Sequence, residues 1–174
     1  GGRRIHKAED GGGVDINIAI DFYGGYDPKP EIVWDLRYGL PFGQEARGVK
    51  IEKNSIGDIY AEHVLEHIPR PINPEDDYKI GFWKLMMDCY DALVVGGTLR
   101  GAVPFYDDQC NVMDPTHVLT LHPDAFNYFG WYNHNRPVVV GWVPGFRPDE
   151  NRYFYPVEVN PANNQVGFIL RKEI

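Results

Sequence analysis

The densest group of ionisable side chains in the sequence is Glu62, His63, Glu66 and His67, within one short segment. His63 and His67 are four residues apart, a spacing that would place both imidazoles on one face of a helix, where they could bind a metal ion. No carboxylate directly follows the first histidine, so the segment lacks the HExxH pattern of helical zinc sites. We therefore predict no metal site here. The alternative interpretation is a solvated or capping polar turn.

Asp114 and His117 form a second group that could perform chemistry. Imidazole titrates near neutrality, so His117 could take a proton from a hydroxyl or amine nucleophile while Asp114 holds its tautomer. The pair is therefore a candidate catalytic site. The alternative is a loop fixed by turn chemistry before Pro115, with His117 buried and hydrogen-bonded.

Two hydrophobic segments, 14–21 and 31–35, end in the acidic residues Asp21 and Asp35. In the first segment apolar side chains recur at every second position, which is typical of a strand. Ligands of open parallel sheets bind outside the carboxyl ends of the strands, so both carboxylates would face one crevice. The alternative is that each aspartate simply ends a strand and begins a turn.

The elements that must position these residues alternate between strands and helices. We predict further strands at 4–9, 56–61 and 98–103 and a long helix over 73–95. The helix is indicated by apolar side chains at steps of three and four, with Gly96-Gly97 at its end. This alternation predicts one α/β domain with a mostly parallel sheet covered by helices. A short helix at 123–129 and an antiparallel hairpin of 152–159 with 165–171 complete the prediction.

Five segments of the sequence form recognisable motifs: VWDLR at 33–37, LPF at 40–42, DIYAEHVLEHI at 58–68, LVVGGTL at 93–99 and DPTHV at 114–118. Together they resemble class I, Rossmann-like S-adenosylmethionine-dependent methyltransferases, and the resemblance covers roughly residues 14–174. The resemblance implies a three-layer sheet, mostly parallel, with its first strand central and the C-terminal antiparallel hairpin at one edge. It also implies that the chain is an enzyme with S-adenosylmethionine as its cofactor.

The resemblance implies a set of cofactor-binding residues. Asp21 would accept hydrogen bonds from the ribose hydroxyls and Asp35 from the adenine amino group, while Glu66 or His67 would serve structure or substrate. The full expected set is Asp10, Gly11, Gly12, Gly13, Asp21, Asp35, Leu36, Glu62 and His63.

The glycine motif departs from the family pattern. The family has a strand, an acidic residue with GxGxG, and then a helix, whereas here residues 9–13 lead directly into the next strand. Glycines can still bring backbone close to a ligand. Two functions stay open: methyl transfer to an unidentified small-molecule or sugar-like acceptor, and a catalytically degenerate binding or scaffold module. A nicotinamide-dependent dehydrogenase is disfavoured, because no GxGxxG opens a helix.

Composition bounds the class of protein. The 174 residues suit a single domain, and the formal net charge of −8 with scattered basic residues disfavours a nucleic-acid partner. No apolar run suits a membrane span and no signal peptide is evident, so we expect a cytoplasmic protein with a small-molecule substrate. The two cysteines are expected to be free thiols. The sequence does not specify the oligomeric state.

Overall fold

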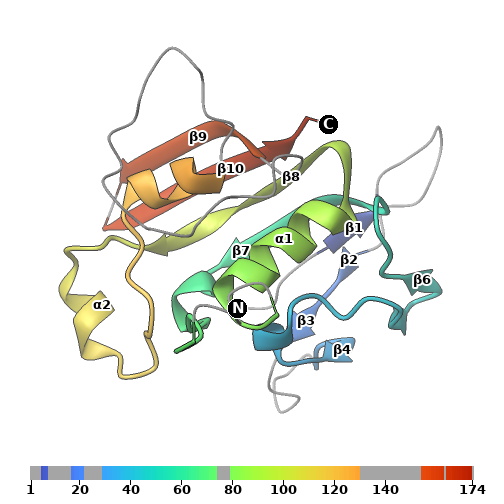
Figure 1. The fold of residues 1–174 in the computed structure, drawn as a ribbon, viewed down its shortest axis with the longest axis horizontal. Coiled ribbons are helices and arrows are strands. Elements are labelled where there is room, and N and C mark those ends of the chain that lie inside the picture. Colours follow the sequence, from blue (N-terminus) through green and yellow to red (C-terminus); the bar gives the residue numbers. More distant parts are fainter. Residues whose placement is uncertain are drawn as a thin grey trace.

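A computed structural model describes residues 5–7, 17–21, 29–73, 79–129, 154–162 and 164–173. Its largest element is a six-stranded sheet in the order β2-β1-β7-β8-β10-β9 (Figure 1). All described pairs in this sheet are antiparallel except β7 with β8. The strands are β1 (Ile5–Lys7), β2 (Asn17–Ile18), β7 (Ile56–Glu62), β8 (Leu93–Pro104), β9 (Phe154–Ala162) and β10 (Gln165–Lys172).

Two small sheets and five short helical segments complete the described structure. β3 (Ile20–Asp21) pairs parallel with β4 (Ile32–Val33), and β5 (Glu45–Ala46) pairs antiparallel with β6 (Val49–Lys50). The α-helices are α1 (Phe82–Ala92) and α2 (Gln109–Met113). The 3-10 helices are η1 (Leu36–Tyr38), η2 (Leu65–His67) and η4 (Pro123–Phe129).

This topology shows that the predicted three-layer, mostly parallel Rossmann-like fold is wrong. The main sheet is mostly antiparallel, and β1 pairs antiparallel with both β2 and β7. Only residues 8–16 connect β1 to β2, whereas a parallel connection needs a crossover of about a dozen residues or more, usually a helix. In the described part of the chain there are also only two α-helices, too few to cover both faces of such a sheet.

The C-terminal hairpin does lie at one edge of the main sheet. β10 pairs with β8 on one side and with β9 on the other. Side chains along β10 alternate between partly exposed and buried, as one covered face requires. On the buried face, Phe168 stacks on Phe126 of η4 and Lys172 lies against Tyr90 of α1. Helices α1 and η4 therefore cover the same face of the sheet (Figure 1).

Helix α1 is shorter than the predicted helix at 73–95. It begins after Gly81, whose φ of 86° is a left-handed conformation that favours glycine, and residues 74–78 lie outside the described residues. It ends at Ala92, because Leu93 pairs with Ile56 and begins β8. Gly96 and Gly97 therefore belong to β8 and do not end the helix. The apolar stripe is confirmed: it is buried at Phe82, Leu85, Met86, Cys89, Tyr90 and Leu93.

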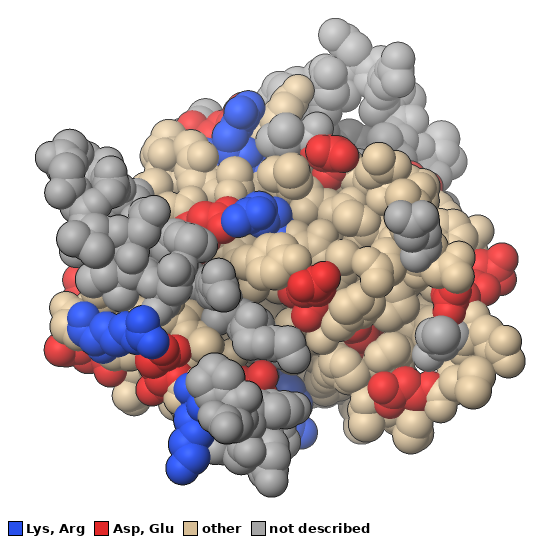
Figure 2. Space-filling view, turned by 180° about the vertical axis from the view of Figure 1, so that it is seen from behind, with Lys and Arg blue, Asp and Glu red and all other residues tan. Residues whose placement is uncertain are grey.

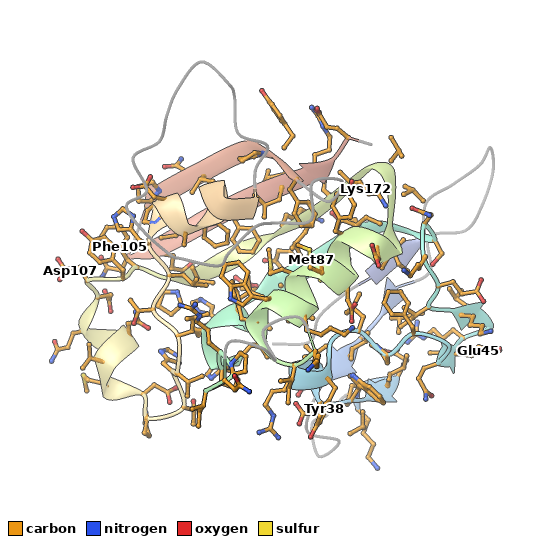
Figure 3. All side chains as sticks on the ribbon, viewed as in Figure 1. Tyr38, Glu45, Met87, Phe105, Asp107 and Lys172 are labelled. Atoms are coloured by element: carbon orange, nitrogen blue, oxygen red, sulfur yellow. The ribbon has the colours of Figure 1, made fainter. Side chains whose placement is uncertain are left out.

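Lys172 connects the C-terminal hairpin to the end of α1 through hydrogen bonds. Its ammonium group is buried and donates to the carbonyls of Tyr90 at 3.0 Å and Leu93 at 2.9 Å, and to Asn54 Oδ1 at 2.7 Å. Figure 3 labels Lys172 beside this end of the helix. The last carbonyls of a helix lack intrahelical donors and carry partial negative charge, so a cation stabilises them.

On the face drawn in Figure 2, Lys and Arg side chains lie beside Asp and Glu and do not gather into one basic patch. Cys89 is buried and is not part of a disulfide among the described residues. Among the described helices, none combines the length and apolar character needed to cross a bilayer.

At Gly101 the strand β8 lies very close to β7, opposite Ala61. A Cβ atom at Gly101 would lie 1.8 Å from the carbonyl oxygen of Ala61, whereas one at Gly167 in β10 would lie 3.7 Å from its nearest neighbour. We expect Gly101→Ala to lower the free energy of unfolding by about 1–3 kcal/mol, the cost of overpacking. The matched control, Gly167→Ala, should leave it unchanged or raise it by up to about 1 kcal/mol. Urea denaturation would compare the two, and equal effects would contradict the prediction.

Asp88 joins α1 to the segment that follows η1. Its Oδ2 accepts a hydrogen bond from the Leu40 amide at 3.0 Å and pairs with the Lys84 ammonium group. Burial raises the pKa of Asp88 above the ordinary 3.8, and Lys84 only partly opposes this effect. Ionised Asp88 is therefore less favourable in the folded protein than in the unfolded chain.

This raised pKa predicts a pH dependence of stability. A carboxyl group whose pKa rises on folding stabilises the protein fully below its unfolded pKa, and that contribution is lost as the pH rises through the folded pKa. We expect the stability of the parent relative to Asp88→Asn to fall as the pH rises from below the ordinary carboxyl pKa of 3.8 towards neutrality. Asparagine does not titrate and keeps an oxygen for the Leu40 amide. Denaturation curves of both proteins over this pH range would test the prediction. If the stability of the parent relative to Asp88→Asn rose with pH, the prediction would be contradicted.

Candidate functional site

The carboxyl ends of β7 and β8 bring two polar loops together. These strands are parallel, so the segments that follow them, 63–68 and 105–119, leave the same edge of the sheet. The carbonyl oxygen of Glu66 accepts hydrogen bonds from the amides of Val118 at 2.9 Å and Leu119 at 3.0 Å. The two loops are therefore held together by backbone bonds at the position of Glu66.

A sharp turn after β7 directs Glu66 into the protein. His63 has a φ of 51°, in the left-handed region, and its amide donates to the Ala102 carbonyl at 2.9 Å. Val64 and Leu65 then pack into the core, and the 3-10 helix η2 places Glu66 inside with 1% of its surface exposed. The segment is thus not the α-helical turn that would align His63 with His67.

The Glu66 carboxylate is buried without a hydrogen-bond donor on either oxygen. Two imidazoles lie close to Oε1: His63 Nδ1 at 3.3 Å and His67 Nε2 at 4.0 Å. A buried carboxylate without donors is costly unless positive charge compensates it. A positive charge near Glu66 would offset this cost.

His67 and His117 complete this group, although they come from different loops. Their rings lie edge to face with centroids 4.8 Å apart. His67 Nδ1 lies 3.1 Å from the Thr116 carbonyl oxygen, and His117 Nε2 lies 3.6 Å from Asp114 Oδ2. His117 Nδ1 is buried and has no hydrogen-bond partner. One ligand atom from each of Glu66, His67 and His117 lies within 4.8 Å of the other two.

The turn chemistry predicted before Pro115 is present. Asp114 Oδ1 accepts from the Thr116 hydroxyl at 2.6 Å and from the Thr116 amide at 2.8 Å. These bonds hold the pKa of Asp114 below its usual value. The His117 side chain is only 10% exposed, so a methyl acceptor would have little access to it as a base. The His117 side chain is thus largely covered, in line with the second interpretation, but its Nδ1 lacks the hydrogen bond that this interpretation assumed.

Asp21 and Asp35, the two predicted strand-end acids, lie near one edge of the small parallel sheet. Asp21 ends β3 opposite Val33, and Asp35 follows β4 by two residues. The Asp35 carboxylate accepts from the Arg37 amide at 3.0 Å and pairs with the Arg37 guanidinium at 2.6 Å. The Arg37 side-chain hydrogen bonds hold the pKa of Asp35 below its usual value.

The other predicted cofactor residues are dispersed. Leu36 is buried and lines an apolar cavity of about 30 Å³, beside Ile20 and Ala61. A cavity of this size has room for about two water molecules and not for a nucleoside. Glu62 lies on the face of β7 opposite Ala61, where Tyr60 donates to it at 2.8 Å. Asp10, Gly11, Gly12 and Gly13 lie outside the described residues.

The residues of the histidine cluster are recognisable in the sequence, but their grouping was predicted wrongly. Helical spacing favoured a pair of His63 with His67, whereas His67 packs against His117 in the structure. The signal was present, because strands 56–61 and 98–103 were both predicted in a parallel sheet. Loops that follow neighbouring parallel strands meet at one edge, which would have brought Glu66-His67 towards Asp114 and His117.

The chain matches no protein-family model and no curated protein.

Replacement of Asp114 tests how the two loops are held together. We expect Asp114→Ala to speed hydrogen exchange of the Val118 and Leu119 amides, because the turn at Thr116 loses its acceptor. Asp114→Asn is the matched control, since its side-chain oxygen can still accept both bonds and exchange should stay near the parent rate. NMR hydrogen exchange would measure these amides. If the alanine and asparagine variants exchanged alike, the turn would not depend on this acceptor.

Proposed function

We propose that this chain is a methyltransferase that binds S-adenosylmethionine and transfers its methyl group to a small-molecule or sugar-like acceptor. The observation that carries the proposal is the pair of acids at the carboxyl edge of the parallel strands β3 and β4. Ligands of parallel sheets bind at this edge. The motif resemblance at 33–37 and 58–68 supports the same activity, although the described residues do not form the family's mostly parallel sheet.

The residues at this edge fit part of the cofactor. The Asp21 carboxylate would accept two hydrogen bonds from the ribose hydroxyls, a bidentate arrangement that suits an ionised acid. Asp35 would accept a bond from the adenine amino group, in competition with the Arg37 guanidinium that already contacts it. Leu36 is buried in the core and would pack beneath this edge without contacting the polar groups of the cofactor. Glu62 points to the other face of β7 and has no part in the proposed contact.

Methyl transfer makes few demands on side chains. The sulfonium of the cofactor is already activated, so the protein contributes mainly by holding donor and acceptor in line. The proposal therefore does not need His117 as a base, which agrees with the small exposure of that side chain.

A second function is favoured by a specific observation. Asp35 is already engaged by Arg37, and the cavity beside Leu36 has only about 30 Å³. Both features suit a degenerate relative that keeps motifs of the family but serves as a binding or scaffold module. Cofactor affinity separates this alternative from the enzyme.

Binding of S-adenosylhomocysteine, the methyl-transfer product, tests the proposal. We expect it to raise the melting temperature and to give a saturable heat in isothermal titration calorimetry. Asp21→Ala should weaken binding by about 1.5–3 kcal/mol, the range for a hydrogen bond to a charged group, which is roughly ten- to a hundredfold. Absence of binding by the parent at millimolar concentration would favour the scaffold function.

Asp107 provides a matched control for the Asp21 variant. It is an exposed aspartate in the turn after β8, labelled in Figure 3, and far in sequence from the β3–β4 edge. Asp107→Ala removes the same charge and should leave S-adenosylhomocysteine affinity unchanged. Equal losses in the two variants would indicate a general charge effect and would contradict the ribose contact.

A further inference from the structure

We propose that Glu66, His67 and His117 bind a divalent transition-metal ion, of which zinc is the best match. Two imidazoles and one carboxylate are a common ligand set for zinc, with a further position left for water or a substrate oxygen. No metal site was predicted from the sequence, because His63 and His67 were the only residues examined there as metal ligands. The inference rests on side-chain geometry at the β7–β8 edge and does not depend on the proposed methyl transfer.

The first observation is that the three side chains present ligand atoms without hydrogen bonds. Both carboxylate oxygens of Glu66 and Nδ1 of His117 are buried and have no hydrogen-bond partner. His67 Nε2 faces Glu66 Oε1 at 4.0 Å, beyond hydrogen-bond distance. Buried polar atoms are normally satisfied, and several such atoms converging on one point indicate an ion.

The second observation is that each imidazole has an oxygen near its other nitrogen. His67 Nδ1 lies 3.1 Å from the Thr116 carbonyl oxygen, and His117 Nε2 lies 3.6 Å from Asp114 Oδ2. Metal-binding histidines almost always donate their second N–H to a carbonyl or a carboxylate, which fixes the tautomer and orients the ring. His67 shows this arrangement, which leaves Nε2 as the metal ligand. At His117 the Asp114 carboxylate lies just beyond hydrogen-bond distance of Nε2, and the unpartnered Nδ1 is left as the ligand. Asp114 is thus a positioning residue for His117.

The distances suit closure around an ion. The three ligand atoms lie within 4.8 Å of one another. Ligands around tetrahedral zinc at bond lengths of about 2.0–2.1 Å are separated by roughly 3.4 Å. Side-chain movements of about 1 Å would therefore complete the site. His67 keeps 34% of its side chain exposed, so an ion can enter from that side.

The main alternative is that His63 alone balances the Glu66 charge. His63 Nδ1 lies 3.3 Å from Oε1, but this imidazole is 41% exposed and approaches only one of the two oxygens. An ion pair with His63 would also leave the free nitrogen of buried His117 unexplained. A metal ion satisfies all three residues at once.

Metal titration of the untagged full chain tests the proposal. After treatment with a chelator and exchange into metal-free buffer, we expect one Zn²⁺ per chain by isothermal titration calorimetry. Co²⁺, used as a spectroscopic probe, should give visible d–d bands that Zn²⁺ abolishes. Absence of saturable Zn²⁺ binding by the parent would overturn the proposal.

Four variants locate the ion. Glu66→Gln and His117→Ala should each weaken Zn²⁺ binding by more than about a hundredfold, and Asp114→Asn by about tenfold or more, the range for loss of an outer-shell partner. His122→Ala is the matched control, because His122 is an exposed histidine paired with Asp124 outside the cluster. Unchanged affinity in Glu66→Gln and His117→Ala, or an equal loss in His122→Ala, would place the ion elsewhere and overturn the assignment.

Thermal stability gives a readout that does not depend on affinity alone. In metal-free buffer we expect Glu66→Gln to melt at or above the parent temperature, because it removes a buried charge without donors. Added Zn²⁺ should raise the melting temperature of the parent and of His122→Ala, but not of Glu66→Gln. If Glu66→Gln melted below the parent in metal-free buffer, and added Zn²⁺ left the melting temperature of the parent unchanged, His63 would be the partner of the carboxylate. The proposed metal site would then be wrong.

Discussion

The parallel pairing of β7 with β8 is the constraint on which the candidate site depends. It sends the carboxyl ends of both strands to one edge, and the absence of a side chain at Gly101 lets them lie close together there. The loops that follow then meet at the Glu66 carbonyl, which two amides of the second loop contact. A single strand direction thus brings together residues that lie some fifty positions apart in the sequence, as the His67–Thr116 contact does across 49.

Much of the local structure could be predicted from the sequence, whereas the topology could not. The strands predicted at 56–61 and 98–103 and the C-terminal hairpin are present as parts of β7, β8, β9 and β10. The antiparallel direction of β1 was not predicted, because the family resemblance implies a parallel first strand. Segment 8–16 is, however, too short for the crossover that a parallel pair needs. Helix α1 was extended too far because Leu93 suits the apolar stripe of the helix as well as the strand that it joins.

The candidate site was missed for a different physical reason. Helical spacing pairs residues four apart, but His63 lies in a left-handed conformation and only a 3-10 turn follows it. The two histidines therefore do not act as a helical pair. The actual partner, His117, is reached through a loop after the neighbouring strand, and such contacts depend on strand order. Periodicity within a segment carries no information about them.

Glu66 is a local conflict of the kind that marks functional sites, because an apolar residue would fill the same buried position at lower cost. Its neighbour Leu65 lines the apolar cavity beside Leu36, so the 3-10 helix η2 belongs both to the core beneath the β3–β4 edge and to the histidine cluster. The residue that lines the apolar cavity therefore directly precedes the buried carboxylate of Glu66.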